Sequence, residues 1–390
     1  MVITVGRNSF LSEFFLLFKN SGILLFFFCF VCVSILMPWH VYAKDIFCLC
    51  VLFFCGLRWK QDKTLLWLLI FSVTFALMSF INHNASGAEQ IGYIVGPVAF
   101  YKFGEILVEK NKSEKLLSTF FVIMIVLLGA DIYSQTFNNI TSGVVVNTMR
   151  RMDDNSLSAT LMGAIVSLGF VGVPYFISVN KPFRSIKAWL FVLLFISSIL
   201  TILHLVNRTG LVIAIIAILA TIYYKVQSRG AGIVILVVIM ATLLILMVAD
   251  TPFVNEFFSA YQSREVDVES SFATGGGRFS RWGDAIGQLF VHPFGWKTEY
   301  GYIHNFWLDV ARIGGIIPFF AIVIATINGT RPMLQLYKIK DSSFIALLLA
   351  LNICFFFTCL VEPIIEGVST YVYLYFMLWG IQKRYCECMF

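Results

Sequence analysis

The sequence between residues 186 and 206 reads IKAWLFVLLFISSILTILHLV, an apolar run that contains a single lysine, Lys187. A second apolar run, residues 209–224, follows after the polar junction Asn207–Arg208. Each run has about the length that a helix needs to cross roughly 30 Å of hydrocarbon. Because lipid offers no hydrogen-bond partners to the backbone, a segment in that position has to be helical. These two runs therefore predict a helical membrane protein.

Runs of this kind recur along the whole chain. Of its 390 residues, 59% are hydrophobic and 13% are charged, whereas soluble proteins carry about 25% charged residues. We expect an all-α integral membrane protein with about twelve transmembrane helices in a single domain, residues 1–390. The expected spans are residues 22–38, 42–57, 64–82, 90–107, 116–134, 156–178, 186–206, 209–224, 232–249, 306–327, 342–361 and 368–382. No small-residue cleavage site follows the first span, so we expect an anchor there, not a signal peptide.

The placement of basic residues orients the chain. Eighteen lysines and arginines fall on one side of the expected spans, whereas the short loops on the other side hold four. By the positive-inside rule, the side with eighteen is cytoplasmic, and it contains both termini. The net charge of +6 is thereby explained without a nucleic-acid partner. The nine cysteines avoid the large outward loop, so no disulfide framework is expected there.

The largest outward segment is the loop of residues 250–303, between the ninth and tenth expected spans. Apolar residues recur in it at helical spacing, first in residues 253–261 and again from Phe279 through Trp282 and Ile286 to Phe290. This spacing predicts two short amphipathic helices lying along the membrane surface. They would cover the outer mouth of the bundle, although ordinary loop packing explains the pattern equally well.

Polar residues gather at the outward ends of the expected spans, where ionisable groups deserve a functional hypothesis. The candidates are Arg150, Arg151, His204, Asn207, Arg208, Thr209, Arg278, Arg281, His304, Asn305, Asp309, Arg312, Glu362 and Glu366. Each alone has a structural explanation: an arginine at a helix end reaches lipid headgroups, and Asp309 with Arg312 can hold helices together. Their convergence from five segments on one membrane face favours a site.

The residue types suit one kind of chemistry. Arginines beside a glycine-rich helix entry form a good phosphate site, because guanidinium groups bind phosphate bidentately and helix N-termini attract anions. A histidine accepts a proton from an attacking hydroxyl near neutral pH. Together they predict displacement of a phosphate or pyrophosphate leaving group by a hydroxyl. No metal-binding cluster or glycine-rich phosphate loop is evident in the sequence, so we expect no metal and no cofactor.

Four motifs in the C-terminal half carry a family resemblance. They are Asn-Arg-Thr-Gly at 207–210, Gly-Arg-Phe-Ser-Arg-Trp at 277–282, His-Pro-Phe-Gly at 292–295 and His-Asn-Phe-Trp-Leu at 304–308. With these motifs the chain resembles the O-antigen polymerase and ligase superfamily of bacterial membrane glycosyltransferases. The N-terminal half is similar in topology only.

The resemblance implies a metal-independent, inverting transfer of a glycan from undecaprenyl pyrophosphate to a sugar hydroxyl, at the periplasmic face of the inner membrane. Arg208 and Arg278 would hold the pyrophosphate, and His304 would orient or deprotonate the acceptor. Further substrate contacts are expected from Arg281, Asn305, Arg150, Arg151, Glu362 and Glu366. The partners implied are lipid-linked glycans and the bilayer, and a chain-length regulator and a flippase are left open.

Three functions stay in view. The Glu362–Gly367 turn resembles that of polymerases, which favours polymerisation of lipid-linked repeat units into O antigen or a related surface polysaccharide. A ligase would use the same chemistry to transfer the polymer to lipid A–core. A flippase or other transporter of lipid-linked oligosaccharides would instead be expected to show internal repeats and charges near the bilayer midplane.

Overall fold

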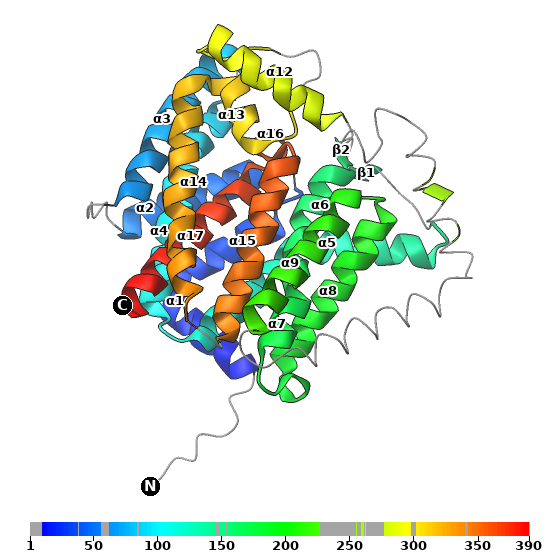
Figure 1. Cartoon of the computed structure of the whole chain (residues 1–390). Helices are drawn as coiled ribbons and strands as arrows, with labels where there is room; N and C mark the ends of the chain where they lie inside the picture. The colour runs from blue at the N-terminus through cyan, green and yellow to red at the C-terminus, as the bar shows by residue number, and fades with distance from the viewer. Residues whose placement is uncertain are drawn as a thin grey trace.

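Helices packed side by side form most of the structure (Figure 1). The computed structural model describes residues 10–37, 39–55, 62–83, 86–144, 149–152, 155–226, 277–297, 302–339 and 342–389, together with positions 255, 259, 260 and 262. The helices are α1 (Phe10–Val33), α2 (His40–Cys55), α3 (Lys63–His83), α4 (Gly87–Lys110), α5 (Glu114–Thr141), α6 (Ala159–Ser167), α7 (Gly172–Ser178), α8 (Ile186–His204), α9 (Arg208–Val226), α12 (Arg278–Val291), α13 (Phe306–Gly314), α14 (Ile316–Leu336), α15 (Ser343–Val361), α16 (Ile364–Gly367) and α17 (Ser369–Met389). Short 3-10 helices, η1 (Leu168–Val171) and η2 (Pro182–Arg184), follow α6 and α7.

Eight helices in the described ranges are long and apolar enough to cross a membrane. They are α1, α3, α4, α5, the continuous segment Leu161–Ser178, α8, α14 and α15. The prediction of a helical, membrane-embedded protein is thus confirmed. Helices also occupy three further expected spans: α2, with 16 residues, α9, whose apolar part is Arg208–Tyr224, and α17. The expected span 232–249 lies outside the described residues.

One expected span is two helices. The prediction of a single span over 306–327 is wrong, because the chain breaks at Gly315 between α13 and α14. Gly315 has φ 79°, and a Cβ there would collide with the backbone oxygen of Pro293. The amide of Ile316 donates to that same oxygen at 2.8 Å. As a result α13 lies at one end of the bundle, and the helix long and apolar enough to cross a membrane is α14, which runs to Leu336.

A small hairpin precedes α6, in a segment for which no strand was predicted. Strands β1 (Met149–Met152) and β2 (Asn155–Ser158) pair antiparallel, with Arg150 opposite Leu157 and Arg151 opposite Ser156. The segment expected to begin a span at 156 therefore begins as a strand, and its helix starts at Ala159. Short strands with polar residues carry little hydropathy signal, so the pattern of spans could not reveal this pairing.

The centre of the bundle is the contact between α4 and α17. A Cβ at Gly104 would meet the backbone oxygen of Met377, and a Cβ at Gly380 would meet that of Tyr101. Glycines at such positions let two membrane helices approach to backbone contact. Helix α17 is buried along most of its length, including the fully buried Trp379. Helix α17 follows the short helix α16, so this core also positions α16.

Helices α12, α13 and α16 lie together at one end of the bundle, with the β1–β2 hairpin to one side (Figure 1). Helix α12 packs on α13 through Ala285, which clusters with Leu308, while Phe279, Ile286 and Phe290 of the same helix are exposed. The second expected amphipathic helix is therefore confirmed as α12. Of the first, within 253–261, only isolated positions are described.

Candidate functional site

Residues from three separate segments meet at the carboxylate of Glu362, which follows α15. Nη2 of Arg278, at the start of α12, lies 3.4 Å from Oε2 of Glu362. Nδ1 of His304 lies 3.9 Å from the same oxygen. Arg278 also donates through Nη1 to the hydroxyl of Thr209 on α9, at 3.1 Å. We call these four residues the Glu362 cluster. The cluster is partly accessible to solvent, because the side chain of His304 is 24% exposed whereas that of Glu362 is 3% exposed.

The position of Arg278 follows from the residue before it. Gly277 has φ 73° and precedes the first turn of α12 in a left-handed conformation. A side chain is disfavoured at this φ, and glycine adopts it without steric cost. The glycine thereby turns the chain so that α12 begins with its N-terminal end beside Glu362. The amide groups at a helix N-terminus attract anions, and the guanidinium of Arg278 adds to that attraction.

His304 sits on a strained backbone. Its φ of 58° is in the left-handed region, which non-glycine residues occupy uncommonly and which is found more often at functional sites. The carboxylate of Asp309 holds this conformation, because Oδ1 accepts from the amide of Ile303 at 2.9 Å and Oδ2 from that of Asn305 at 3.3 Å. Among the described residues, Nδ1 of His304 is buried without a hydrogen-bond partner. The ring is thus held by its backbone, with one nitrogen turned toward Glu362.

Asn305 has a structural task. Its Oδ1 accepts from the amide of Leu308 at 3.1 Å and caps α13, while its Nδ2 donates to the backbone oxygen of Leu360 at 3.1 Å. The side chain is buried, and both of its polar atoms are engaged within the protein. It fixes the His304 backbone relative to the end of α15. A direct contact between Asn305 and substrate stays a prediction.

The second glutamate of the turn after α15 forms a separate ion pair. Arg312 on α13 donates from Nη2 to Oε2 of Glu366 at 2.6 Å, and its Nε lies 3.5 Å from Oδ1 of Asp309. The expected pairing of Asp309 with Arg312 is therefore present, and Glu366 extends it to α16. Burial raises the pKa of the Asp309 carboxyl, whereas the amide of Ile303 and the charge of Arg312 oppose that rise. This network holds α13 against α16.

The other predicted arginines are on α9, α12 and β1. Arg208 begins α9, immediately before Thr209. Arg281 is one turn after Arg278 on α12. Arg150 and Arg151 are on β1, and the hairpin leads into Ala159, whose backbone oxygen accepts from Asn207 at 3.4 Å. The backbone of the hairpin is described without its side chains, so the roles of Arg150 and Arg151 stay predictions.

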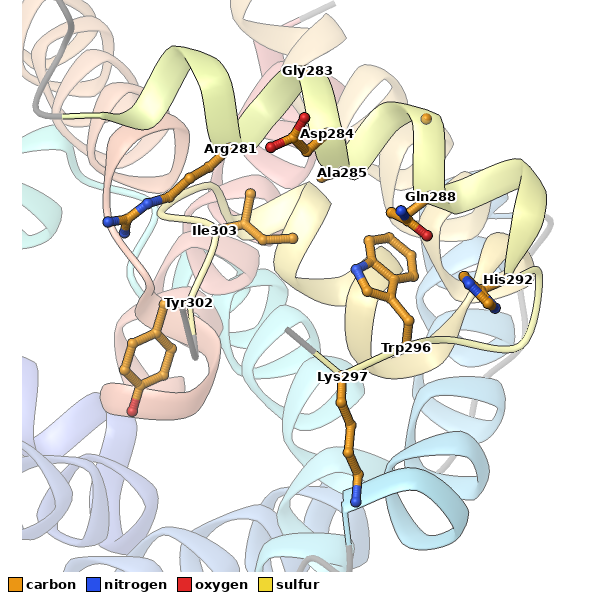
Figure 2. Close-up of a pocket in the computed structure, with 11 residues that line it drawn as sticks. Arg281, Gly283, Asp284, Ala285, Gln288, His292, Trp296, Lys297, Tyr302 and Ile303 are labelled. Carbon is orange, nitrogen blue, oxygen red and sulfur yellow. The ribbon is translucent and has the colours of Figure 1, made fainter. Parts of the chain in front are cut away.

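A pocket of about 520 Å³ opens beneath α12 (Figure 2), and two of its lining residues, Arg281 and Ile303, are close in sequence to Arg278 and His304. It is lined by Arg281, Gly283, Asp284, Ala285, Gly287, Gln288, His292, Trp296, Lys297, Tyr302 and Ile303. Sequence reasoning found only Arg281 among these as a site residue. A tryptophan and a lysine directly after the His292–Gly295 motif were the available signal. Within the described ranges, no group of three His, Cys, Asp or Glu side chains is placed to hold a metal ion.

Comparisons with known proteins add no family assignment. The chain matches no protein-family model. No curated protein matches it either. What can be inferred about its function therefore rests on the motifs and on the geometry of the Glu362 cluster.

Proposed function

We propose that this protein is a membrane glycosyltransferase that polymerises lipid-linked oligosaccharide repeat units at the periplasmic face of the bacterial inner membrane. The observation that carries the proposal is the meeting of Arg278 and His304 at the buried carboxylate of Glu362, beside the Arg208–Thr209 start of α9. Thr209, Arg278 and His304 lie in three of the four motifs that resemble the polymerase and ligase superfamily. Each of them lies within 4 Å of another member of the Glu362 cluster.

The proposed reaction joins two lipid-linked glycans. A hydroxyl of the acceptor sugar attacks the anomeric carbon of the donor, a new glycosidic bond forms with inversion, and the bond from that carbon to pyrophosphate breaks. His304 takes the hydroxyl proton. With Nδ1 facing Glu362, Nε2 is the nitrogen left to accept it. The carboxylate then stabilises the charged imidazolium, as the acid of a catalytic triad does for its histidine.

The arginines act on the leaving group. Negative charge builds on the pyrophosphate oxygens as the bond breaks, and fixed cations aimed at that position lower the barrier. Arg278 is held in place by Thr209 and Glu362 before substrate arrives. Arg208, on the adjoining helix end, supplies a second cation. Because the pyrophosphate departs on its lipid carrier, the reaction needs no nucleotide, and the family resemblance implies that it is metal-independent.

The proposed topology places this chemistry outside the cell membrane. Twelve spans result when α2, α9, α17 and residues 232–249 are added to the eight apolar helices, with α14 as the tenth span. Both termini are then cytoplasmic, and residues 250–303 form a periplasmic loop that contains α12. The Glu362 cluster lies at the outer end, as acceptance of lipid-linked substrates from that face requires.

Polymerisation is favoured over ligation by the turn after α15. The resemblance to polymerases lies in the Glu362–Gly367 turn, and both glutamates of that turn are paired with arginines of the outer end, Arg278 and Arg312. The turn that favours a polymerase over a ligase therefore contacts the helices α12 and α13 beside the candidate site.

The test is a lipopolysaccharide gel from the native host with the gene deleted and then complemented. We expect deletion to collapse the ladder to core plus one repeat, wild type to restore it, and His304→Ala to fail at equal protein level. Arg184→Ala, an exposed arginine in η2, is the matched control and should restore the ladder. Complete loss of the O chain with long polymer on the carrier would identify a ligase instead. An intact ladder with His304→Ala would refute the catalytic role.

A further inference from the structure

Helix α12 carries a row of large, exposed apolar side chains. Phe279, Ile286 and Phe290 are spaced seven and four residues apart, so they share one flank of the helix. All three are exposed, and Phe290 has 70% of its surface accessible. Single exposed apolar residues are ordinary, whereas a contiguous group of them marks a contact surface. This flank of α12 is therefore a candidate interaction surface.

The polar side chains of α12 lie on a different flank. Ser280, Asp284 and Gln288 recur every four residues and are exposed. Ala285 and Leu289 form a buried stripe between the two exposed flanks. A helix that is polar on one exposed flank and strongly apolar on another is typical of helices that lie in a membrane–water interface.

The apolar row continues beyond the end of α12 toward α3, which is long and apolar enough to cross a membrane. Nδ2 of Asn82, near the end of α3, donates to the backbone oxygen of Phe294 at 2.6 Å. The side chain of Phe294 is exposed, and so are those of Phe80 and Ile81, directly before Asn82. The segment that follows α12 thus adjoins exposed apolar residues of a helix that can cross a membrane.

The same segment also adjoins α14, a second helix that can cross a membrane. The amide of Ile316, the first residue of α14, donates to the backbone oxygen of Pro293 at 2.8 Å. Ile317 and Phe320, which follow in the first turns, are exposed. Figure 1 shows α12 lying across the end of the bundle at which α14 begins. Exposed apolar residues of α3 and α14 face lipid when these helices cross a membrane, so lipid reaches the segment that continues α12.

We propose that the apolar flank of α12, formed by Phe279, Ile286 and Phe290 and continued by Phe294, docks in the hydrocarbon of the leaflet at this end of the bundle. The continuity with α3 and α14 favours lipid as the occupant, because a bilayer covers the exposed residues of all three helices at once. The inference goes beyond the proposed function, since it requires a membrane-embedded bundle and no transfer chemistry.

Lipid contact on this flank bears on the Glu362 cluster through the helix itself. Arg278, in the first turn of α12, contacts Thr209 and Glu362. The indole N–H of Trp282 donates to the backbone oxygen of Ile303 at 3.2 Å. Protein contacts thus hold α12 on one side, and the docked flank holds it on the other. The bilayer thereby helps to keep in place the helix that carries Arg278.

The first experiment is photo-crosslinking of the purified full chain in phospholipid nanodiscs. The photoreactive residue benzoylphenylalanine resembles phenylalanine in shape and replaces Phe290 in one variant. Phe80, exposed on α3, is the lipid-facing reference position, and Gln288, on the polar flank of α12, is the matched control. We expect a phospholipid adduct, detected by mass spectrometry, at Phe290 as at Phe80, and none above background at Gln288.

Three results would overturn the proposal. They are an adduct at Phe80 without one at Phe290, equal adducts at Phe290 and Gln288, or a cross-link from Phe290 to a second copy or another segment of the chain in place of lipid. None of these measurements involves a glycan donor. The docking can therefore fail while transfer stands, and transfer can fail while the docking stands.

Hydrogen exchange in the same nanodiscs tests whether the lipid contact stabilises α12. In Ile286→Gln/Phe290→Gln, the amides of residues 278–291 should exchange at least about tenfold faster, because two large apolar side chains lose their burial in lipid. Asp284→Gln, on the polar flank, should exchange as wild type does. Peptides from α17 should be unchanged in both variants, which shows that the bundle is intact. Wild-type exchange of α12 in the double variant would contradict the proposal.

Discussion

The guanidinium of Arg278 lies 3.4 Å from the carboxylate of Glu362, and the glutamate is almost completely buried. A buried carboxylate is costly unless a cation and hydrogen bonds compensate it, and removing one partner of such a pair leaves the other uncompensated. The pair joins α12 to the end of α15, two elements whose sequence positions are far apart. It therefore serves the fold and the proposed chemistry at once, and the two roles can be separated by substitution.

Replacing Glu362 with glutamine should remove catalysis while preserving the fold. The amide keeps the shape of the side chain but cannot stabilise a charged imidazolium at His304. We expect the transfer rate to fall by about 100-fold, which is within the range for disabling general-base catalysis. The rate should be measured with purified protein in nanodiscs and a lipid-linked repeat unit. More than half of the wild-type rate would contradict the role.

Arg278→Ala should be less stable than the double variant Arg278→Ala/Glu362→Gln. The single change leaves the Glu362 carboxylate buried without its cation, whereas the double change leaves a neutral amide. We expect the double variant to recover part of the lost melting temperature, measured by thermal unfolding in detergent. Neither protein should polymerise. Equal melting temperatures for the two variants would show that the ion pair has no structural effect.

Gly315→Ala should destabilise the outer end of the bundle. The residue has φ 79°, and the added methyl group would meet the backbone oxygen of Pro293. We expect a loss of about 1–3 kcal/mol, as is usual for strained backbone sites, seen as a lower melting temperature. Gly87→Ala is the matched control, since no atom lies within 4 Å of its Cβ position and its φ is ordinary. The control should change stability by less than about 1 kcal/mol.

Gly104→Ala should disturb the membrane core. A Cβ at this position would meet the backbone oxygen of Met377 on α17, so α4 and α17 would have to separate. The same Gly87→Ala variant is the control for a glycine substitution in α4. We expect a lower yield of folded protein for Gly104→Ala, measured by fluorescence-detected size-exclusion chromatography. A wild-type elution profile and yield would indicate that the helices can shift apart freely.

The proposed orientation predicts which positions a membrane-impermeant maleimide reaches. Ser280 is exposed on α12, and Cys388 is exposed near the C-terminus. In intact spheroplasts, Ser280→Cys should be labelled in a background that lacks the exposed Cys388. In the natural background, Cys388 should be labelled only after permeabilisation. The reverse pattern would invert the topology and place the Glu362 cluster in the cytoplasm.

Hydropathy predicted the apolar helices well. A helix that can cross a membrane needs a long apolar run, and such a run can be seen directly in the local sequence. It missed the break at Gly315, since the run IGGIIPFF is apolar on both sides of it. That break depends on the oxygen of Pro293, a tertiary contact that no local pattern contains. The hairpin of β1 and β2 escaped for a similar reason, because its pairing lies among polar residues between two apolar segments.

The candidate site was predicted by residue type, and its internal arrangement was not. Arg278, His304 and Glu362 were expected on one face, and the structure brings them together. Asn305 was expected to contact substrate. In the structure its side-chain oxygen caps α13, and its side-chain nitrogen donates to the backbone oxygen of Leu360. Trp296 and Lys297, which line the pocket beneath α12, were not predicted, because a pocket formed by α12 and the following turn has no signature in a single sequence.

The backbone contact between α4 and α17 also bears on how a lipid-linked substrate of the proposed kind would reach the Glu362 cluster. At Gly104 and Gly380 the two helices leave no room even for one added methyl group. A polyprenyl tail is far wider than that, so it could not pass between these two helices at this contact. Under the proposed function, the carrier lipid would therefore approach the Glu362 cluster by another route.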